Sequence, residues 1–291
     1  MKERPLIAGI GELLWDVLPS GKMLGGAPCN FVYHAMQAGC GGYVISAIGK
    51  DELGDELLKV VHELMINNQY IQVNDFPTST VTVMLNDKGH PNYTIHENVA
   101  WDHIQMTPEI LKFSQDLDAV CFGSLAQRNL QSKSSIQSFL SLLRKDCIKV
   151  FDINLRQKYY SKGIIKRSCE VADIVKLNND ELPVISRYFG FKGVIEMQLK
   201  QLLRYFSLRY VVYTMGEKGS IIMGKDEHSY LEAPKVVVAD TVGAGDAFTG
   251  ILTAGLLRGF SLLAVHKKAT EIAAYVCTQK GATPDFIDKI F

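Results

Sequence analysis

A run of small residues followed by a carboxylate and an apolar helical segment lies near the end of the chain. It reads Asp240-Thr241-Val242-Gly243-Ala244-Gly245-Asp246-Ala247-Phe248, and the apolar run continues to Leu257. The first amides of a helix lack intrahelical partners and the helix dipole adds positive charge there, so this junction predicts an anion-binding site. Gly243 and Gly245 let the backbone approach a phosphate closely. Asp246 is then a candidate general base for a phosphoryl acceptor, or else only a helix-capping residue.

Two groups of residues near the start of the chain are suited to binding a ligand rich in hydroxyl groups. Asp16 follows the first strand-like run, where a carboxylate can accept hydrogen bonds from paired hydroxyls. The later run Gly25-Gly26-Ala27-Pro28-Cys29-Asn30 opens a helix; Gly26 lets a ligand lie against the backbone and Asn30 offers a donor and an acceptor. The alternative interpretation is a solvated loop carboxylate followed by an ordinary turn.

A third candidate group is Asp152-Ile153-Asn154-Leu155-Arg156, at the end of a predicted strand. Ligands of open α/β sheets bind at such strand ends. The guanidinium of Arg156 can bind a phosphate or a sugar carboxylate through two parallel hydrogen bonds. A structural salt bridge between Arg156 and Asp152 is the competing interpretation.

Two more strand ends carry residues suited to a nucleotide and its metal ion. Asn178 and Glu181 are three apart at a predicted helix start, where their oxygens could organise hydrated Mg²⁺, although an N-cap with an acidic third residue has the same pattern. Thr214, Gly216 and Gly219 form a glycine-bearing turn after a buried strand, which suits nucleotide phosphates or an ordinary hairpin.

Familiar nucleotide-binding motifs are missing from the sequence. There is no G-x-x-x-x-G-K-[ST] P-loop, and there is no H-R-D or D-F-G set of a protein kinase. Gly9 and Gly11 begin a possible dinucleotide fingerprint, but Leu14 occupies the third position, which disfavours an NAD oxidoreductase. Any nucleotide site in this chain is therefore built differently.

The composition indicates a globular cytoplasmic protein. Of the 291 residues 47% are hydrophobic and 21% charged, and the formal net charge is zero, so we expect neither nucleic acid nor a membrane as a partner. No apolar run reaches 18 residues, and the N-terminus offers no signal-peptide core. The six cysteines form no C-x-x-C pair, which favours reduced, buried thiols.

Short apolar runs alternate with helix-length segments along most of the chain. This rhythm predicts an α/β fold, with a mainly parallel sheet between two layers of helices, in a single domain over residues 1–291. The predicted strands are residues 6–10, 43–48, 119–122, 149–153, 174–177 and 210–213.

Two segments, about residues 11–26 and 78–100, break this rhythm. In the second, Thr80, Thr82 and Asn86 alternate with apolar residues, so one face of the predicted strand is polar and the other apolar. We expect these segments to form one small β-layer that acts as a lid, the alternative being a plain surface hairpin.

Taken in order, these motifs resemble the ribokinase-like (PfkB) family of carbohydrate kinases over essentially the whole chain, and most closely its fructokinase branch. The N-terminal segment, including Pro77-Thr78-Ser79-Thr80, carries the likeness to that branch. The motifs that carry the family resemblance are Gly11-Glu12 with Asp16, Gly25 to Asn30, Gly49-Lys50-Asp51-Glu52-Leu53-Gly54, Asp152 with Asn154 and Arg156, Asn178 with Glu181, Thr214 with Gly216 and Gly219, and Asp240 to Asp246.

The resemblance implies a three-layer α/β/α core with a β-lid over the sugar. It implies that Asp246 deprotonates the acceptor hydroxyl while amides of Gly243, Ala244 and Gly245 stabilise the transferring phosphoryl group. It further implies a sugar site, a nucleotide site with Mg²⁺ and, in some relatives, a monovalent-cation site such as one for K⁺ near Asp240 and the Gly281-Ala282 turn. The implied substrate-binding residues are Asp16, Gly26 and Asn30, which hold the sugar, and Arg156, a phosphate ligand in some members. The implied ATP and Mg²⁺ residues are Asn178, Glu181, Thr214, Gly216 and Gly219.

Three features depart from the expected pattern. Cys29 stands where a small alanine is usual, Gln127-Arg128 stands where ribokinases carry an acidic sugar contact, and Trp15 could narrow the pocket beside Asp16. We therefore expect an ATP-dependent kinase of a monosaccharide, with fructose favoured over ribose, and a homodimer formed through the lid. A 2-keto-3-deoxygluconate-type kinase, a nucleoside kinase and a catalytically silent sugar-binding regulator remain the alternatives.

Overall fold

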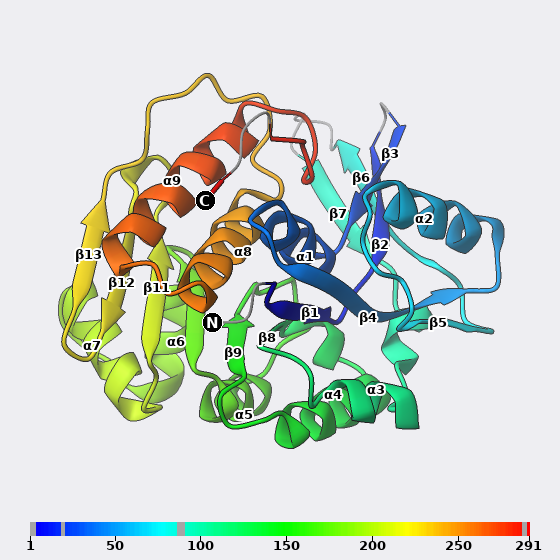
Figure 1. Ribbon diagram of the computed structural model, residues 1–291, viewed down its shortest axis with the longest axis horizontal. Helices are drawn as coiled ribbons and strands as arrows, with labels where there is room; N and C mark the ends of the chain where they lie inside the picture. The colour runs from blue at the N-terminus through cyan, green and yellow to red at the C-terminus, as the bar shows by residue number, and fades with distance from the viewer. Residues whose placement is uncertain (1–3, 19–20, 86–90, 287–289) are drawn as a thin grey trace.

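The computed structural model describes residues 4–18, 21–85, 91–286 and 290–291 (Figure 1). Its main sheet has the strand order β13-β12-β11-β10-β9-β8-β1-β4-β5. Neighbouring strands run parallel from β5 to β11, and β12 and β13 are antiparallel. The bounds are β1 Leu6–Ile10, β4 Gly41–Gly49, β5 Ile71–Asn74, β8 Ala119–Gly123, β9 Ile148–Asp152, β10 Ile174–Asn178, β11 Tyr210–Thr214, β12 Ser220–Gly224 and β13 His228–Leu231.

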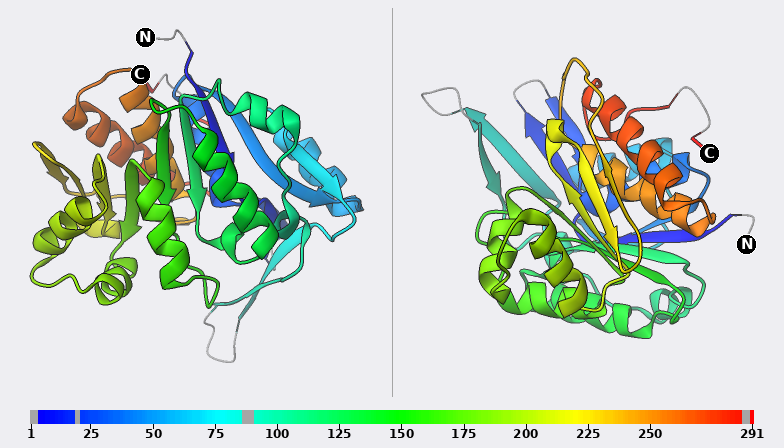
Figure 2. Two further views of the ribbon diagram at one scale, coloured as in Figure 1. Left: turned by 90° about the horizontal axis from the view of Figure 1, so that it is seen from below. Right: turned by 90° about the vertical axis from the view of Figure 1, so that its left-hand side faces the viewer.

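Helices cover both faces of this sheet, as Figure 2 shows in side views. One layer comprises α1 Ala27–Gln37, α2 Glu52–Glu63, α8 Ala244–Leu257 and α9 Leu262–Cys277. The other comprises α3 Pro108–Phe113, α4 Leu130–Leu142, α5 Lys162–Val171, α6 Glu181–Phe189 and α7 Ile195–Tyr205. The predicted three-layer α/β/α fold is confirmed.

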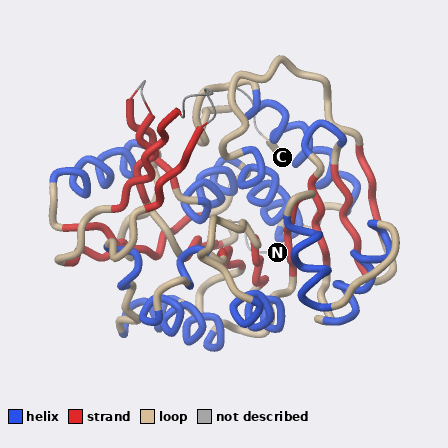
Figure 3. Tube along the Cα trace, turned by 180° about the vertical axis from the view of Figure 1, so that it is seen from behind, coloured by secondary structure: helices blue, strands red, loops and turns tan. Residues whose placement is uncertain are grey.

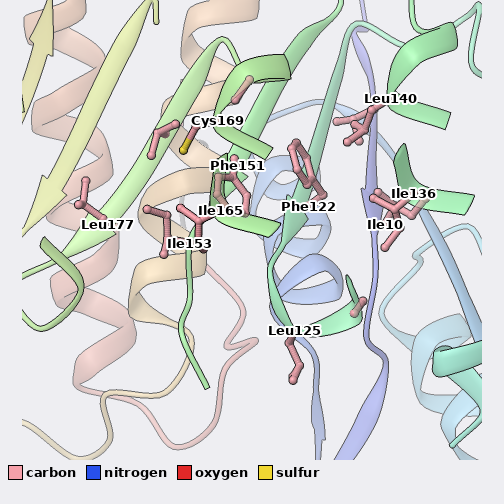
Figure 4. Close-up of a cluster of buried hydrophobic side chains, with 14 of the residues drawn as sticks. Ile10, Phe122, Leu125, Ile136, Leu140, Phe151, Ile153, Ile165, Cys169 and Leu177 are labelled. Atoms are coloured by element: carbon pink, nitrogen blue, oxygen red, sulfur yellow. The ribbon is translucent and has the colours of Figure 1, made fainter. Parts of the chain in front are cut away.

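Alternating residues of the central strands supply two separate cores. Phe151 of β9 faces the α3–α7 layer, where it packs with residues of β8, α4 and α5 (Figure 4). Its neighbour Val150 faces the other layer, formed by α1, α2, α8 and α9. Both strand faces are buried, which explains why these strands are nearly continuous apolar runs and were recognisable in the sequence.

Four strands of the described chain form a separate small sheet in the order β3-β2-β6-β7, which projects from the layered core (Figure 3). The bounds are β2 Leu14–Leu18, β3 Gly21–Gly25, β6 Ser79–Leu85 and β7 Pro91–Ile95. The two predicted lid segments therefore pair with each other, through β2 and β6. Asn86 and the rest of residues 86–90 lie outside the described residues.

A buried arginine anchors the end of this lid to the core. Arg128 holds Asp102 through two hydrogen bonds of 2.8 Å and donates a third to the backbone oxygen of His96, just after β7. Its guanidinium also stacks on the rings of Trp101 and Tyr159. Arg128 thus ties the end of the lid to the core, while its Nη1 atom is buried without a partner among the described residues.

Candidate functional site

The anion-binding turn at the start of α8 depends on glycine. Gly243 is the N-cap residue and has a left-handed backbone with a φ of 79°. A side chain there would also meet the backbone of Ala282 at 2.6 Å, so no other residue fits. As first-turn residues, Gly245 and Asp246 have backbone N–H groups without partners inside the helix. The turn therefore keeps the free N–H groups that the predicted anion-binding site requires.

Asp246 lies in this turn, partly buried, against helix α1. Its carboxylate accepts a hydrogen bond of 2.8 Å from Nδ2 of Asn30. Burial, followed by the negative charge of Asp152, raises the pKa of Asp246 to about 7, although Lys176, Asn30 and Arg156 act in the opposite direction. A carboxylate with this pKa accepts a proton far more readily than an ordinary aspartate at neutral pH.

Asn30 holds Asp246 with one end of its amide and leaves the other end unused. The residue is 4% exposed, and its Oδ1 atom is buried with no partner among the described residues. Buried acceptors rarely remain unpaired, so this oxygen is available to a ligand hydroxyl. The structure thus brings Asn30 and Asp246, which are far apart in the sequence, into one site.

Asp16 lies on β2, against Gly25 of the neighbouring strand β3. A side chain on Gly25 would meet Oδ2 of Asp16 at 2.4 Å, so glycine is required beside this carboxylate. Burial raises the pKa of Asp16 to about 6, while Arg156 lowers it. The side chain of Trp15 points to the opposite face of β2, where its indole N–H donates to the backbone oxygen of Leu53. Trp15 therefore does not narrow the pocket beside Asp16.

Gly26 and Cys29 form the start of helix α1 close to these groups. Gly26 is the N-cap residue with a φ of 115°, and a side chain on it would meet the backbone oxygen of Glu12 at 2.4 Å. Cys29 is fully buried, and burial together with the charge of Asp246 raises its pKa to about 12. The predicted buried thiol is confirmed.

Arg156 follows β9 and is exposed. Its guanidinium donates to the backbone oxygen of Leu155 at 3.2 Å, and its charge acts on Glu12, Asp16 and Asp246. The alternative of a salt bridge to Asp152 is not realised, because Asp152 pairs with Lys176 at 3.0 Å. Arg156 therefore keeps its donors available beside the carboxylates.

Asn178 and Glu181 cap helix α6 and connect two loops. Oδ1 of Asn178 accepts from the backbone of Asp180 and Glu181 at 2.9 and 3.0 Å. The carboxylate of buried Glu181 accepts from the backbone N–H groups of Asn178 and Leu155, each at 2.8 Å. The structure thus shows the capping pattern, and in addition a tie between the loops after β9 and β10.

The nucleotide-binding turn predicted after β11 lies beside this cap. Thr214 is the register partner of Asn178 in neighbouring parallel strands. Gly216 and Gly219 have φ values of 56° and 97°, and a side chain on Gly219 would meet the backbone oxygen of Leu231 at 2.0 Å. The five residues predicted to serve ATP and Mg²⁺ thus gather at the carboxyl edge of β10 and β11.

Two buried charged residues of the site had no role in the sequence interpretation. Lys176 points from β10 toward the turn at Gly245. Glu12 is 2% exposed, and its Oε2 atom has no partner in the described part of the chain. Glu12 belongs to a quoted motif and Lys176 to the predicted strand 174–177, but only the strand register and the burial reveal that they face the site.

The acidic groups of the site do not form a ready metal cage. Within the described ranges, no group of three or more His, Cys, Asp or Glu residues is arranged to hold a metal ion. Carboxylates nevertheless outnumber cations here, with Glu12, Asp16, Asp152, Glu181 and Asp246 against Lys176 and Arg156. A polyphosphate would need a companion cation to enter such a site.

Comparisons with known proteins show the family of this chain. The profile of the pfkB family of carbohydrate kinases matches residues 20–289. The chain is 27% identical to an ATP-dependent 6-phosphofructokinase of Thermoanaerobacterium thermosaccharolyticum over 96% of its length and 90% of the relative's. It is 28% identical to a fructokinase of Salmonella typhimurium, covering 85% of this chain and 83% of that one.

A solved structure has the same architecture. The crystal structure of a sugar kinase from Pyrococcus horikoshii in complex with ATP superposes with a TM-score of 0.78 at 25% identity, covering 95% of this chain and 94% of that one. The family match covers most of the sequence, and the fructokinase relatives support the branch that the motifs indicated. The chain therefore belongs to the pfkB family of carbohydrate kinases, in its fructokinase-like branch.

Proposed function

We propose that the protein is an ATP-dependent kinase that transfers the γ-phosphoryl group to a primary hydroxyl of a monosaccharide, with fructose as the substrate. The observation that carries this proposal is the placement of Asp246, a base with a raised pKa, in the first turn of a glycine-capped helix. A site that only bound sugar would need no such base, which disfavours the sugar-binding regulator. The fructokinase relative supports the choice of sugar.

Each residue then has a part in the transfer. Asp246 takes the proton from the attacking hydroxyl, while the backbone amides of Gly243, Ala244 and Gly245 stabilise the charge on the transferring group. The sugar is held by Asp16, by the unused oxygen of Asn30 and by the backbone at Gly26. Arg156 neutralises phosphate charge from the open side of the site.

ATP with Mg²⁺ fits the chemistry of the site. The excess of carboxylates over cations calls for a cation accompanying the phosphates, and Mg²⁺ is usually held by substrate phosphates, water and one or two carboxylates. Asn178 and Glu181 would hold it through water, and it would neutralise the charge of the β- and γ-phosphates. Thr214, Gly216 and Gly219 would lie against the nucleotide.

A monovalent cation such as K⁺ is proposed beside the same turn. Asp240 accepts hydrogen bonds from the backbone of Val242 and Gly281, so its carboxylate links the anion-binding turn to the loop before the C-terminus. A cation there would hold this loop and thereby the first turn of α8.

We also propose a homodimer paired through the lid and a cytoplasmic location. A small sheet with free edges favours a partner strand or face. The six cysteines are all free thiols, five of them buried, as expected for a reducing compartment. No described helix has the length and apolarity needed to cross a membrane.

A panel of acceptors with ATP and Mg²⁺, read as ADP release, tests this function. The panel contains fructose, ribose, 2-keto-3-deoxygluconate, a nucleoside and fructose 6-phosphate, the last because one relative is a 6-phosphofructokinase. We expect the highest kcat/KM with fructose, and a kcat lowered by about 10²–10⁴ in the Asp246→Asn variant. If only another compound of the panel is turned over, that compound replaces fructose as the proposed substrate. If no compound is turned over, the proposal of a sugar kinase is rejected.

A further inference from the structure

Lys176 and Asp152 form an ion pair at the carboxyl ends of two neighbouring strands. They are register partners in the parallel pair β9–β10. Nζ of Lys176 lies 3.1 and 3.0 Å from the two carboxylate oxygens of Asp152. Their side chains are only 9% and 5% exposed. Removing two charges from water is costly and a well-packed apolar pair is often as stable, so such a pair calls for a reason beyond stability.

The ammonium group also lies directly against the proposed anion-binding turn. A side chain built on Gly245 would meet Nζ of Lys176 at 2.8 Å. Gly245 immediately precedes Asp246 in the first turn of α8. The glycine thus leaves room for the lysine as well as for a ligand. The positive charge is held at the point where the helix begins.

Asp152, one member of the ion pair, lines a small cavity together with the proposed base. Its volume is about 10 Å³, and Asp152, Asp246, Asn154, Thr249 and Cys121 are among the residues that line it. This volume is close to the minimum needed for one water molecule, and the lining offers several polar partners. Asp152 and Asp246 therefore line the same small cavity, together with apolar residues such as Phe31 and Phe122.

Charged groups from several elements act on the residues around this space. Lys176 is acted on by Asp152 of β9, Glu181 of α6 and Asp246 of α8; burial alone would lower its pKa, but these carboxylates outweigh burial and raise it. Asp246 is acted on by Asp152, Lys176, Asn30 and Arg156, and its charge reaches the thiols of Cys29 and Cys121. Glu12 lies within reach of Asp152 and Arg156.

We propose that Lys176 is a positioning residue for phosphoryl transfer: clamped by Asp152 beneath Gly245, its ammonium group sets the charge of the pocket in which Asp246 receives its proton. This inference rests on the proposed function, since it presumes that Asp246 is the base. Lys176 stays protonated throughout. Asp152 favours the protonated form of Asp246 and Lys176 favours the ionised form, so the pair balances the base between the two states.

The first test measures Asp246 without any substrate. The protein is labelled with ¹³C at the aspartate carboxyl carbons and titrated by NMR, and the Asp246 signal is identified by its loss in Asp246→Asn. We expect Lys176→Met to raise the midpoint of that titration by about one pH unit, the usual minimum for losing a nearby opposite charge. Asp152→Asn should lower it. Equal midpoints in the wild type and Lys176→Met would overturn the proposal.

The second test follows kcat against pH with the acceptor that the wild-type protein turns over best. In Lys176→Met the acidic limb should move to higher pH, and kcat should recover at alkaline pH. A merely structural lysine would instead lower kcat equally at every pH, which also overturns the proposal. If no acceptor is turned over, the proposed function fails on its own and the NMR titration still decides the inference.

Two further variants guard against misfolding. Lys176→Met leaves Asp152 unpaired, so the double variant Asp152→Asn/Lys176→Met, which removes both charges, is measured beside it. We expect its Asp246 midpoint below that of Lys176→Met, because removing the negative charge of Asp152 favours the ionised form of Asp246; equal midpoints in these two variants contradict the inference. Lys149→Met removes a lysine paired with Asp173 near the start of β9 and should change neither readout.

Discussion

A lysine–aspartate pair lies near each end of the neighbouring strands β9 and β10. The two pairs differ in the exposure of their side chains and in their surroundings. Near the amino end, Lys149 lies 3.3 Å from Asp173, with side chains 16% and 37% exposed. At the carboxyl end, Lys176 lies 3.0 Å from Asp152, with side chains 9% and 5% exposed. The first pair has solvent on one side, whereas the second faces a helix N-terminus and a partly buried carboxylate.

This comparison shows why chemistry gathers at one edge of the sheet. The members of the two pairs are three residues apart along each strand, so the pairs leave opposite faces. The amino-end pair links the starts of the two strands, where the backbone N–H of Lys149 also donates a hydrogen bond to the carboxylate of Asp173. The carboxyl-end pair lies where loops and helix starts converge, the usual ligand position in an open α/β sheet. The surroundings of the two pairs account for their different uses.

The largest effect is expected at the carboxyl edge itself. Asp246→Asn keeps the hydrogen bond from Asn30 but cannot take a proton, so kcat should fall by about 10²–10⁴, the usual contribution of a general base. Steady-state kinetics with the best acceptor measure this, and sugar binding should persist by calorimetry. A variant that keeps about a third of the wild-type turnover would show that Asp246 only caps the helix.

Asp16→Ala tests the lid side of the same edge. Loss of two charge-assisted hydrogen bonds to the sugar, each of roughly 1.5–3 kcal/mol, should raise KM for the sugar at least about a hundredfold. The KM for ATP should change little, because Asp16 lies on β2 and not beside β10 and β11. Equal changes in both KM values would make Asp16 an ordinary loop carboxylate.

The same charge that serves the chemistry should cost stability. The pKa of Asp246 is raised from 3.8 to about 7, so its ionised form is disfavoured in the folded state. The cost is absent below pH 3.8, grows as the pH rises toward 7 and is complete above it. Asp246→Asn should therefore raise the free energy of unfolding by about 1–3 kcal/mol at pH 8, a gain that fades toward pH 4. Denaturation at both pH values measures it, and a loss of stability at pH 8 would contradict the prediction.

Glu181→Gln should have a smaller effect on metal use. The carboxylate of Glu181 accepts hydrogen bonds from two backbone N–H groups. The amide of glutamine would place a donor against one of these N–H groups, and the lost hydrogen bond would loosen the loops after β9 and β10. The Mg²⁺ concentration for half-maximal rate should rise several-fold. If the Mg²⁺ titration coincides with that of the wild type, Glu181 only caps helix α6.

The smallest effect is expected at the amino edge. Asp173→Asn removes the partly exposed ion pair with Lys149 but keeps an acceptor for the backbone N–H of Lys149. The free energy of unfolding should fall by less than about 1 kcal/mol, as for other exposed pairs, and kcat should stay unchanged. A large loss of kcat would mean that the two edges of the sheet are not independent.

Much of the fold was readable because its strands are buried on both faces. The predicted strand at residues 210–213 is observed as Tyr210–Thr214, and the predicted run 174–177 as Ile174–Asn178. The pairing of residues 11–26 with residues 78–95 was also foreseen, from their departure from the βα rhythm. Sequence periodicity could not tell which partner Asp152 would choose, since Arg156 is nearer along the chain and Lys176 is nearer across the sheet.

The sequence by itself determined the glycines, the carboxylates and the order of the motifs, and with them the family. The glycines are recognisable in the sequence because Gly243 and Gly26 have backbone conformations that other residues adopt only with strain. Asp246 is recognisable because it lies directly after the glycine turn that begins helix α8. Only the tertiary structure decided that Asn30 holds Asp246, that Trp15 turns away from the pocket, and that Lys176 lies under Gly245. These contacts join residues from different elements, and their distances follow from strand register and helix packing, which no local pattern encodes.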